Sequence, residues 1–561
     1  MLLLILACTS PETPADVVMT GGNIHTMDAT NSGAQALAIR DGVLVYVGDD
    51  ASAFVGPDTR EQALGGATVL PAFHDAHTHL LWSGADLLMV DLYSAVTTDE
   101  LQAEILAWAE ANPDEAWVQG GGWDTSLFYG RIDASLLDAV VPDRPAYVYS
   151  ADSHIGLAST LALAAAGITA DTPDPSDGTI ERDADGNPTG VLLEGAMTLV
   201  DSLIPAYAAA TVDHGLKDAQ QEANRYGVVS VVDANVTEWM LEGYARADAR
   251  GALSVRVFGA GQVDPGDTGA VERLTAWQVE YGSPRVTVNA AKLYLDGIIE
   301  SGTATMIEPY EDGSNGTPVF TDDDLRSLAT ALDAAGFQLH AHAIGDGAVR
   351  QFLDTIALVE ADNGNRDRRP LAAHLEVVDP DDIGRFAELG VLADFQAVWA
   401  WPDSYIQQLT WPVIGDERSQ WLYPIGQIVA AGGTYVGGSD WSVTSQNPFE
   451  AIEAAVTRQN PYLNDGPVLT PDALVDVLTA VRAYTSAGAS ASFSDDISGS
   501  IEVGKQADLV VLDDDPLTLN PYDLSQLRVG QTWLDGVRVF ALDPSQPEDS
   551  ARVRRHHGEG R

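Results

Sequence analysis

Val69-Leu-Pro-Ala-Phe-His-Asp-Ala-His-Thr-His79 carries an apolar run directly into two histidines that are one residue apart. Alternate side chains of an extended strand point to the same face, so we expect His77 and His79 to project together, with Asp75 below them. Two imidazoles at a strand end can bind one transition-metal ion. Because such an ion needs more than two ligands, the rest of the chain is expected to supply the others.

Strand-like apolar runs alternate with alanine-rich, helix-like segments along the middle of the chain, which is typical of a parallel α/β fold. About eight strands are predicted, at 68–73, 228–232, 254–259, 286–293, 337–342, 371–375, 391–395 and 434–438. Eight is the number that a (β/α)8 TIM barrel needs. The active site of such a barrel lies at the carboxyl ends of its strands.

The two ends of the chain differ from this middle. Residues 16–69 and 490–545 have the pattern of short strands and turns, so we expect one composite β-sandwich domain beside a barrel at 70–489. The long stretch between the first two barrel strands carries its own strands and turns. It predicts an inserted α+β subdomain at 115–200, over the mouth of the barrel. The polar, basic residues 546–561 are expected to form a loose tail.

The formal net charge of -54 over 561 residues opposes binding to nucleic acid and adsorption to an anionic membrane. We interpret the charge as a solvated acidic surface, with a specific cationic partner as the alternative. The 45% apolar fraction is ordinary for a globular chain, so disorder is not expected.

The chain has one cysteine, Cys8, which excludes an internal disulfide. It follows a short apolar run and resembles the end of a bacterial lipoprotein signal, with residues 1–15 as signal and tether. We therefore expect lipidation at Cys8 and a lipid-anchored place in the bacterial cell envelope, periplasmic or on the surface. The alternative is an accidental cysteine in an apolar N-terminus without signal function, and then a cytoplasmic protein.

Residues of metal-binding type stand at the ends of the other predicted barrel strands. His342 ends the fifth and His374 the sixth, Asp440 follows the eighth, and Lys292 lies near the end of the fourth. Lys292 is one of only three lysines, and a buried lysine is costly unless it is paired or modified. A neutral amine can add carbon dioxide to form a carbamate, which can bridge two metals. The alternative is a lysine that reaches solvent or pairs with Asp296.

This set of residues, in this order, resembles the amidohydrolase superfamily. The segments 71–79, 342–346, 437–441 and 499–512 are similar to its amidohydrolase-3 branch, which includes YtcJ-like proteins and N-substituted formamide deformylases. The resemblance covers about residues 16–540. It implies two divalent ions per chain, with Zn²⁺ as the expected metal. It implies further that His77 and His79 hold the more buried ion, and that carboxylated Lys292 bridges it to a second ion, held by His342 and His374.

The same resemblance implies that Asp440 touches the first metal and is the catalytic proton carrier, a general base and then a general acid. The expected reaction is hydrolysis of a non-peptide, linear amide-type C–N bond by metal-activated hydroxide. The small-molecule substrate would be an N-substituted formamide or an N-acyl amine. The alternatives are a cyclic-amide hydrolase, a deaminase, and a non-catalytic ligand-binding surface lipoprotein. Lys292 argues against a deaminase, because the deaminase branch lacks the carboxylated lysine. Asp440 argues against a non-catalytic binding protein, which needs no proton carrier. A homodimer is compatible with the sequence.

Three residues of the inserted region are expected to bind substrate. His154 matches a histidine that contacts substrate in the family, and Trp123 and Asp124 are expected to line the pocket. For the last two, the alternative is a turn with a buried tryptophan. Two further histidines are expected to serve packing: His340 as a satisfied core side chain, and His74 on the face away from His77.

Overall fold

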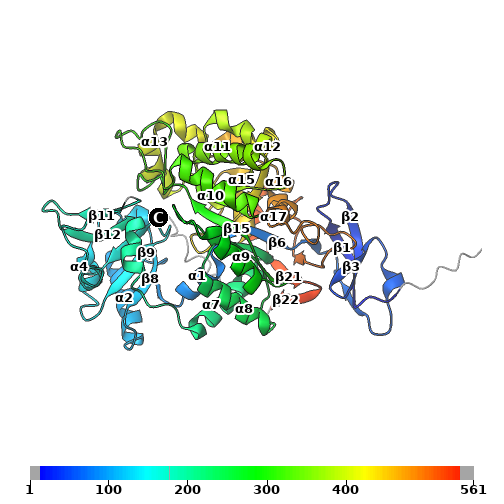
Figure 1. Ribbon diagram of the computed structural model, residues 1–561. Helices are drawn as coiled ribbons and strands as arrows, with labels where there is room; N and C mark the ends of the chain where they lie inside the picture. The colour runs from blue at the N-terminus through cyan, green and yellow to red at the C-terminus, as the bar shows by residue number, and fades with distance from the viewer. Residues whose placement is uncertain (1–12, 176, 544–561) are drawn as a thin grey trace, which may run out of the picture.

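The computed structural model describes residues 13–175 and 177–543 of the chain (Figure 1). The predicted lipidation site Cys8 and the predicted tail at 546–561 lie outside the described residues. In the part that is described, no helix combines the length and the apolar character needed to cross a membrane.

Eight parallel strands form one sheet in the described part of the chain, in the order β6, β13, β14, β15, β16, β17, β18, β19. The last strand lies beside the first, so the sheet nearly closes. This arrangement confirms the predicted TIM barrel. The strands are β6 (Phe73–Thr78), β13 (Val228–Val236), β14 (Arg256–Gln262), β15 (Val286–Tyr294), β16 (Gln338–Ala343), β17 (Leu371–His374), β18 (Leu392–Phe395) and β19 (Thr434–Gly437).

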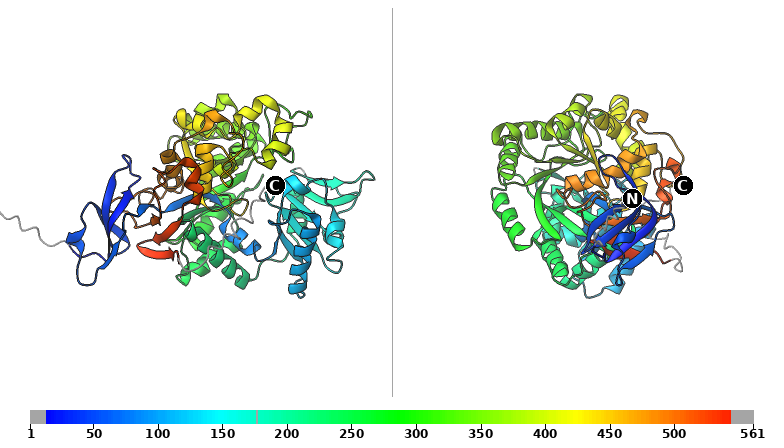
Figure 2. Two further views of the ribbon diagram at one scale, coloured as in Figure 1. Left: turned by 180° about the vertical axis from the view of Figure 1, so that it is seen from behind. Right: turned by 90° about the vertical axis from the view of Figure 1, so that its right-hand side faces the viewer.

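Helices surround this sheet, as the end-on view in Figure 2 shows. In α11 the buried residues Val349, Phe352, Leu353 and Ile356 recur at helical spacing, so one face of the helix packs on the barrel. The surrounding helices are α1 (Leu80–Asp86), α7 (Ala209–Arg225), α8 (Glu238–Ala249), α9 (Ala270–Glu280), α10 (Asp322–Ala334), α11 (Asp346–Asn363), α12 (Ile383–Leu389), α14 (Ile425–Ala430), α15 (Pro448–Thr457), α16 (Val477–Ala483) and α17 (Ser486–Ala491).

The first barrel strand begins later than predicted. The apolar run at 68–73 is divided between two sheets: β5 (Thr68–Pro71) pairs with β1 and β20, whereas β6 starts at Phe73 in the barrel. The predicted boundary is wrong because both strands are buried, so hydrophobicity does not mark the point where the chain passes between sheets. His77 consequently lies within a strand, and His79 lies just beyond its end.

Strands from both ends of the described chain form a second sheet, in the order β22, β21, β20, β5, β1, β2, β3, with β4 beside β1. The tight turn between β2 and β3 uses positive φ angles at Asp41 and Gly42, which suits these two residue types. The strands are β1 (Val17–His25), β2 (Gly33–Arg40), β3 (Val43–Gly48), β4 (Arg60–Ala63), β20 (Leu509–Leu512), β21 (Val529–Leu534) and β22 (Val537–Ala541).

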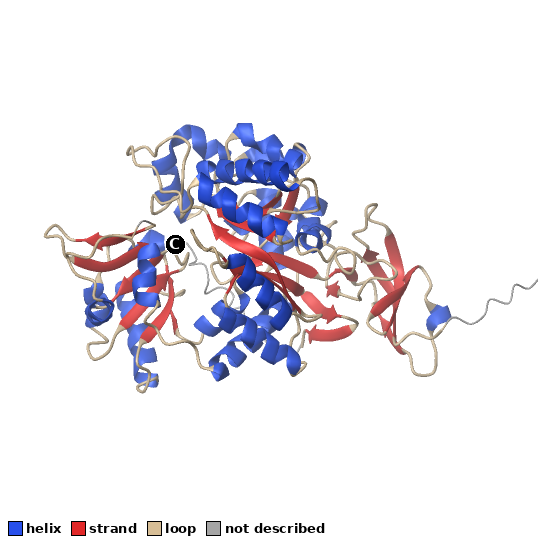
Figure 3. Cartoon of the chain, viewed as in Figure 1, coloured by secondary structure: helices blue, strands red, loops and turns tan. Residues whose placement is uncertain are grey.

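A third sheet belongs to the inserted region, in the order β11, β12, β10, β9, β8, β7, and lies across the barrel from β1–β3 (Figures 1 and 3). The inserted region starts before the predicted residue 115, since β7 belongs to its sheet and the capped helix α2 (Thr98–Ala111) packs on that sheet. Its strands are β7 (Val90–Asp91), β8 (Val118–Trp123), β9 (Ala146–Ser150), β10 (Ile155–Ala158), β11 (Gly178–Arg182) and β12 (Pro188–Glu194); the helices α3 (Thr125–Phe128), α4 (Ala134–Asp138) and α5 (Thr160–Ala166) accompany them.

Candidate metal centre

The first and last barrel strands bring His77, His79 and Asp440 together. Oδ1 of Asp440 lies 3.5 Å from Nε2 of His77 and 3.1 Å from Nε2 of His79, and all three residues are buried. Asp75 fastens the two strands, because its carboxylate accepts hydrogen bonds from the backbone N–H and the hydroxyl of Ser439. The backbone N–H of Asp440 also donates to the carbonyl of His77, at 2.7 Å.

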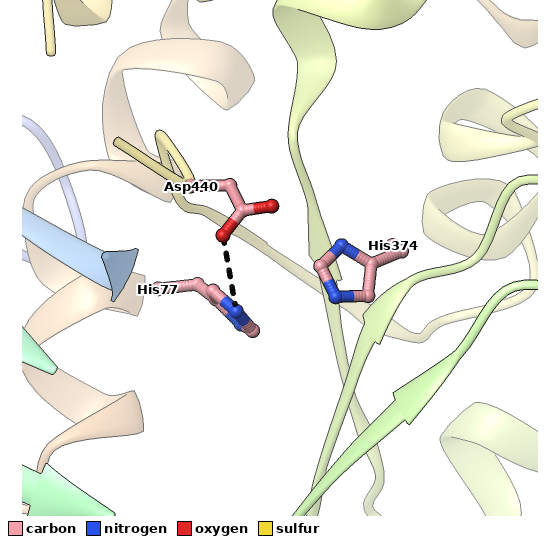
Figure 4. A group of neighbouring side chains, drawn as sticks. All are labelled: His77, His374 and Asp440. Carbon is pink, nitrogen blue, oxygen red and sulfur yellow. Dashed lines mark ion pairs between the residues drawn. The ribbon is translucent and has the colours of Figure 1, made fainter. Parts of the chain in front are cut away.

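His374 and His342 complete the ring of imidazoles. Atoms of His77, His374 and Asp440 lie within 4.8 Å of one another, as one metal ion would require (Figure 4). The ring centroids of His342 and His374 are 4.5 Å apart. His374 and Asp440 have φ angles of 79° and 51°, in the left-handed region that is costly for residues other than glycine. Such strain is typical of functional sites.

The donor atoms of this cluster are buried without hydrogen bonds. Within the described chain they are Nε2 of His77, Nε2 of His342, Nδ1 of His374 and Oδ1 of Asp440, whose contacts with His77 and His79 are ion-pair contacts only. On His79 the nitrogen without a hydrogen bond is Nδ1, whereas Nε2 is the one that faces Asp440. Buried polar atoms almost always have partners, so a group of orphaned atoms in one place requires an explanation. Imidazole nitrogens and a carboxylate oxygen are ligands for zinc and similar ions, and the residues therefore fit a divalent metal centre.

Lys292 is buried on the same cavity wall, with Nζ 4.8 Å from the ring centroid of Tyr294. Burial lowers the pKa of Lys292 to about 7, despite the opposing effect of Asp440 and Asp394. No ion pair joins Lys292 to any described residue, so the alternative pairing with Asp296 is wrong. The carboxylate of Asp296 instead accepts a hydrogen bond from Nδ1 of His342, at 3.2 Å, which leaves Nε2 of His342 available.

A second group lies deeper in the barrel. Nδ1 of His77 is 2.9 Å from Nε2 of His340 and 3.5 Å from Oδ2 of Asp394. The predicted satisfied state of His340 is only half present, because its Nδ1 has no hydrogen-bond partner. Asp394 was not anticipated from the sequence, although one acidic residue inside the apolar run Leu392-Ala-Asp-Phe395 was the available signal. Burial raises the pKa of the Asp394 carboxyl well above its usual range.

The cluster opens into a cavity of about 1700 Å³ between the barrel and the inserted domain. The predicted ligands line it, and so does His154, whose ring centroid lies 5.3 Å from that of His342. Burial alone would lower the pKa of His154, but the carboxylate of Glu194, 2.7 Å from its Nδ1, raises that pKa to about 9. Trp399 stacks on His374 in the same cavity, with centroids 5.6 Å apart.

The two other residues predicted to bind substrate, Asp124 and Trp123, lie in different surroundings, and only Asp124 lines the cavity. Asp124 lines the cavity and caps α3 by accepting a hydrogen bond from the backbone N–H of Ser126. Trp123 does not line it: the side chain is fully buried in the core of the inserted domain, and its Nε1 donates to the carbonyl of Val148, at 3.3 Å. The predicted pocket role of Trp123 is thus replaced by packing, because alternate residues of β8 face opposite sides of the sheet.

Comparisons with known proteins agree with this fold and site. The chain is 30% identical to N-substituted formamide deformylase of Arthrobacter pascens over 544 residues, 93% of this chain and 98% of the relative. It is 28% identical to the protein YtcJ of Bacillus subtilis over 543 residues, again 93% and 98% of the two chains. A crystal structure of an uncharacterized metal-dependent hydrolase from Pyrococcus horikoshii covers 90% of this chain and 99% of its own, with 25% identity and a TM-score of 0.73. The profile of the amidohydrolase family matches residues 60–540, and the chain therefore belongs to the amidohydrolase family of hydrolases.

Proposed function

We propose that this protein is a metal-dependent hydrolase of a linear, non-peptide amide bond, such as that of an N-substituted formamide or an N-acyl amine. The observation that carries the proposal is a set of buried imidazole and carboxylate atoms without hydrogen bonds, on residues that line one cavity at the carboxyl ends of the barrel strands. The 30% identity to a formamide deformylase supports the substrate class.

The residues that would hold two divalent ions are His77, His79, His342, His374 and Asp440, with Zn²⁺ as the expected metal. When bound, such ions supply Lewis acidity and lower the pKa of water. Lys292 would join them as a carbamate. Because burial lowers the pKa of Lys292 to about 7, a substantial part of the amine is neutral near pH 7. Nζ can then form a bond to the carbon of carbon dioxide and release one proton. The carbamate anion also removes the need to bury a cationic lysine among imidazoles.

Asp440 would move the proton. Its carboxylate would accept a proton from the attacking water as the oxygen adds to the substrate carbonyl carbon. It would then give that proton to the nitrogen as the C–N bond breaks, so the products are a carboxylic acid and an amine. His154, whose ring lies beside that of His342, would contact the carbonyl oxygen, and Trp399 would offer an apolar face to the remainder of the substrate.

The test is hydrolysis of a panel of N-formyl amines, N-acyl amines and cyclic amides by enzyme reconstituted with metal. We expect the linear amides to be hydrolysed, and Asp440→Asn to lower kcat by about 10²–10⁴-fold because the proton carrier is lost. A preference for cyclic amides would replace the linear-amide proposal. Asp440→Asn enzyme that works at the wild-type rate would remove the proton-transfer role, and a fully metallated protein that hydrolyses nothing in the panel would favour a binding protein.

A further inference from the structure

Glu194 lies where the inserted domain meets the barrel. It ends β12, and its backbone N–H donates to the carbonyl of His154, at 3.1 Å, since the adjoining residues Ile155 and Leu193 are paired strand partners. The backbone at Glu194 has a φ of 51°, which is costly for a residue with a side chain. The fold holds this residue in a strained conformation directly beside a residue of the active-site cavity.

Both oxygens of the Glu194 carboxylate are engaged. Oε2 lies 2.7 Å from Nδ1 of His154, and Oε1 accepts a hydrogen bond from the hydroxyl of Thr303, at 2.6 Å. Thr303 belongs to the barrel, in the loop that follows β15. The backbone N–H of Ile298 donates to the Thr303 hydroxyl, at 2.9 Å. The hydroxyl proton has two acceptors in reach, the Glu194 carboxylate at 2.6 Å and the Ile298 carbonyl at 3.2 Å, and the charged, nearer carboxylate is favoured.

The barrel loop is shaped to let this carboxylate approach. A Cβ atom at Gly297 would lie 2.3 Å from Oε1 of Glu194 and 2.2 Å from Oγ1 of Thr303. Any larger residue at this position would therefore displace the pair. The absence of a side chain at Gly297 is what allows the inserted domain and the barrel to share this hydrogen-bond chain.

The other nitrogen of His154 remains for the substrate. No described residue hydrogen-bonds to Nε2, and the ring lies over His342 in the cavity wall. The partner of one imidazole nitrogen sets the orientation of the ring and the role left to the other nitrogen. We propose that Glu194 is a positioning residue: its carboxylate holds His154 by Nδ1, with Thr303 fastening the other oxygen, so that Nε2 is presented to the substrate carbonyl oxygen. This inference rests on the proposed amide hydrolysis.

A double-mutant cycle between Glu194 and His154 tests the inference. Glu194→Ala should lower kcat/KM by about 10–100-fold in the wild-type background, with unchanged metal content and melting temperature. In a His154→Ala background the same change should cost less than about twofold, because Glu194 has no ring left to hold. A loss of equal size in both backgrounds would overturn the proposal, since Glu194 would then act independently of His154.

Variants of Thr303 test the positioning role of Glu194 even if Glu194→Ala does not fold. Thr303→Val keeps the shape of the side chain but removes the hydrogen bond to Oε1, and it should lower kcat/KM by about 3–10-fold. Thr303→Ser should restore the wild-type value. Thr305→Val is the matched control, because the Thr305 hydroxyl in the same loop has no hydrogen-bond partner among the described residues. Equal losses from Thr303→Val and Thr305→Val would contradict the proposed role of Thr303.

A binding measurement separates this inference from the proposed function. Acetohydroxamate offers a carbonyl oxygen without being consumed, so its Kd can be measured by calorimetry on the metal-loaded protein. We expect Glu194→Ala and His154→Ala each to raise the Kd, and the double variant to be no weaker than His154→Ala alone. If this cycle holds while no amide is hydrolysed, the proposed reaction fails and the positioning role stands. If amides are hydrolysed and the cycle is additive, the positioning role fails alone.

Discussion

At Lys292 the barrel buries an amine among imidazoles rather than beside a carboxylate partner. Its neighbours across the sheet are Gln262 on β14 and His340 on β16, and its Nζ lies over the ring of Tyr294. A permanently charged amine there would carry the cost of desolvation without an ion pair to offset it. The proposed conversion to a carbamate would change the sign of the charge and would make the side chain a metal ligand.

Lys292→Ala is therefore expected to lose both metal and activity, and Lys292→Arg is expected not to restore them, because a guanidinium forms no comparable carbamate. The measurements are metal content per chain and amide hydrolysis, each with and without added bicarbonate. Lys217→Ala is the matched control, since Lys217 is exposed on α7. Retention of two ions per chain by Lys292→Ala would contradict the proposed role of Lys292 as a metal ligand.

At the scale of elements, the barrel is joined to the composite sheet by a buried charge cluster. The guanidinium of Arg256, in the barrel strand β14, pairs with Asp508 at 2.5 Å and also with Asp535, next to the strands β20 and β21. Arg256 and Asp508 are both buried. A charge that loses its partner in such a place is left without water to solvate it.

Arg256→Leu is expected to lower the free energy of unfolding by about 3–5 kcal/mol, because it leaves the buried Asp508 unpaired. Arg326→Leu serves as the control: Arg326 and Asp362 form an exposed pair, which should be worth about 0–1 kcal/mol. Denaturant titrations of the two variants provide the comparison. Equal losses from both would mean that the buried cluster contributes no more than a surface pair.

Residues at the ends of barrel strands could be predicted from the sequence, whereas contacts between the inserted domain and the barrel could not. His342 and His374 could be found from the sequence because each ends an apolar strand, and strand order in a parallel barrel brings such ends together. The contact between Glu194 and Thr303 could not, because it joins the last residue of a strand in the inserted domain to an irregular barrel loop, and no periodic pattern in the sequence relates the two. Likewise, hydrophobicity does not show that Ala72 separates two sheets, since the residues on both sides are buried.

At the scale of the whole molecule, 83 acidic and 29 basic residues leave a net charge of -54. Self-repulsion of this size disfavours the compact state, and the unfolded chain relieves it by expansion. Mobile ions screen the repulsion over a Debye length that falls from about 30 Å at 0.01 M to about 8 Å at 0.15 M. The stability of the protein should therefore depend on ionic strength.

The melting temperature is expected to rise with sodium chloride, with most of the gain between about 0.01 and 0.15 M, where screening changes most. Calorimetric scans at fixed pH, with metal saturated, measure the effect. Sucrose at equal osmolality is the control, because it acts by exclusion from the surface and does not screen charge. A melting temperature that does not change with sodium chloride but rises with sucrose would show that repulsion between surface charges does not limit the stability of the protein.

The short connection between β5 and β6, which lie in different sheets, also affects the order in which the protein can fold during synthesis. The strand that carries His77 begins two residues after one that pairs with β20, near the far end of the chain. Synthesis proceeds from the N-terminus, so β5 has its partner β1 from the start but receives its second partner, β20, only after more than four hundred further residues have left the ribosome. The histidine pair is translated early, yet the sheet that holds the preceding strand β5 is complete only when β20 has been made. We therefore expect the metal centre to reach its final form late in biosynthesis.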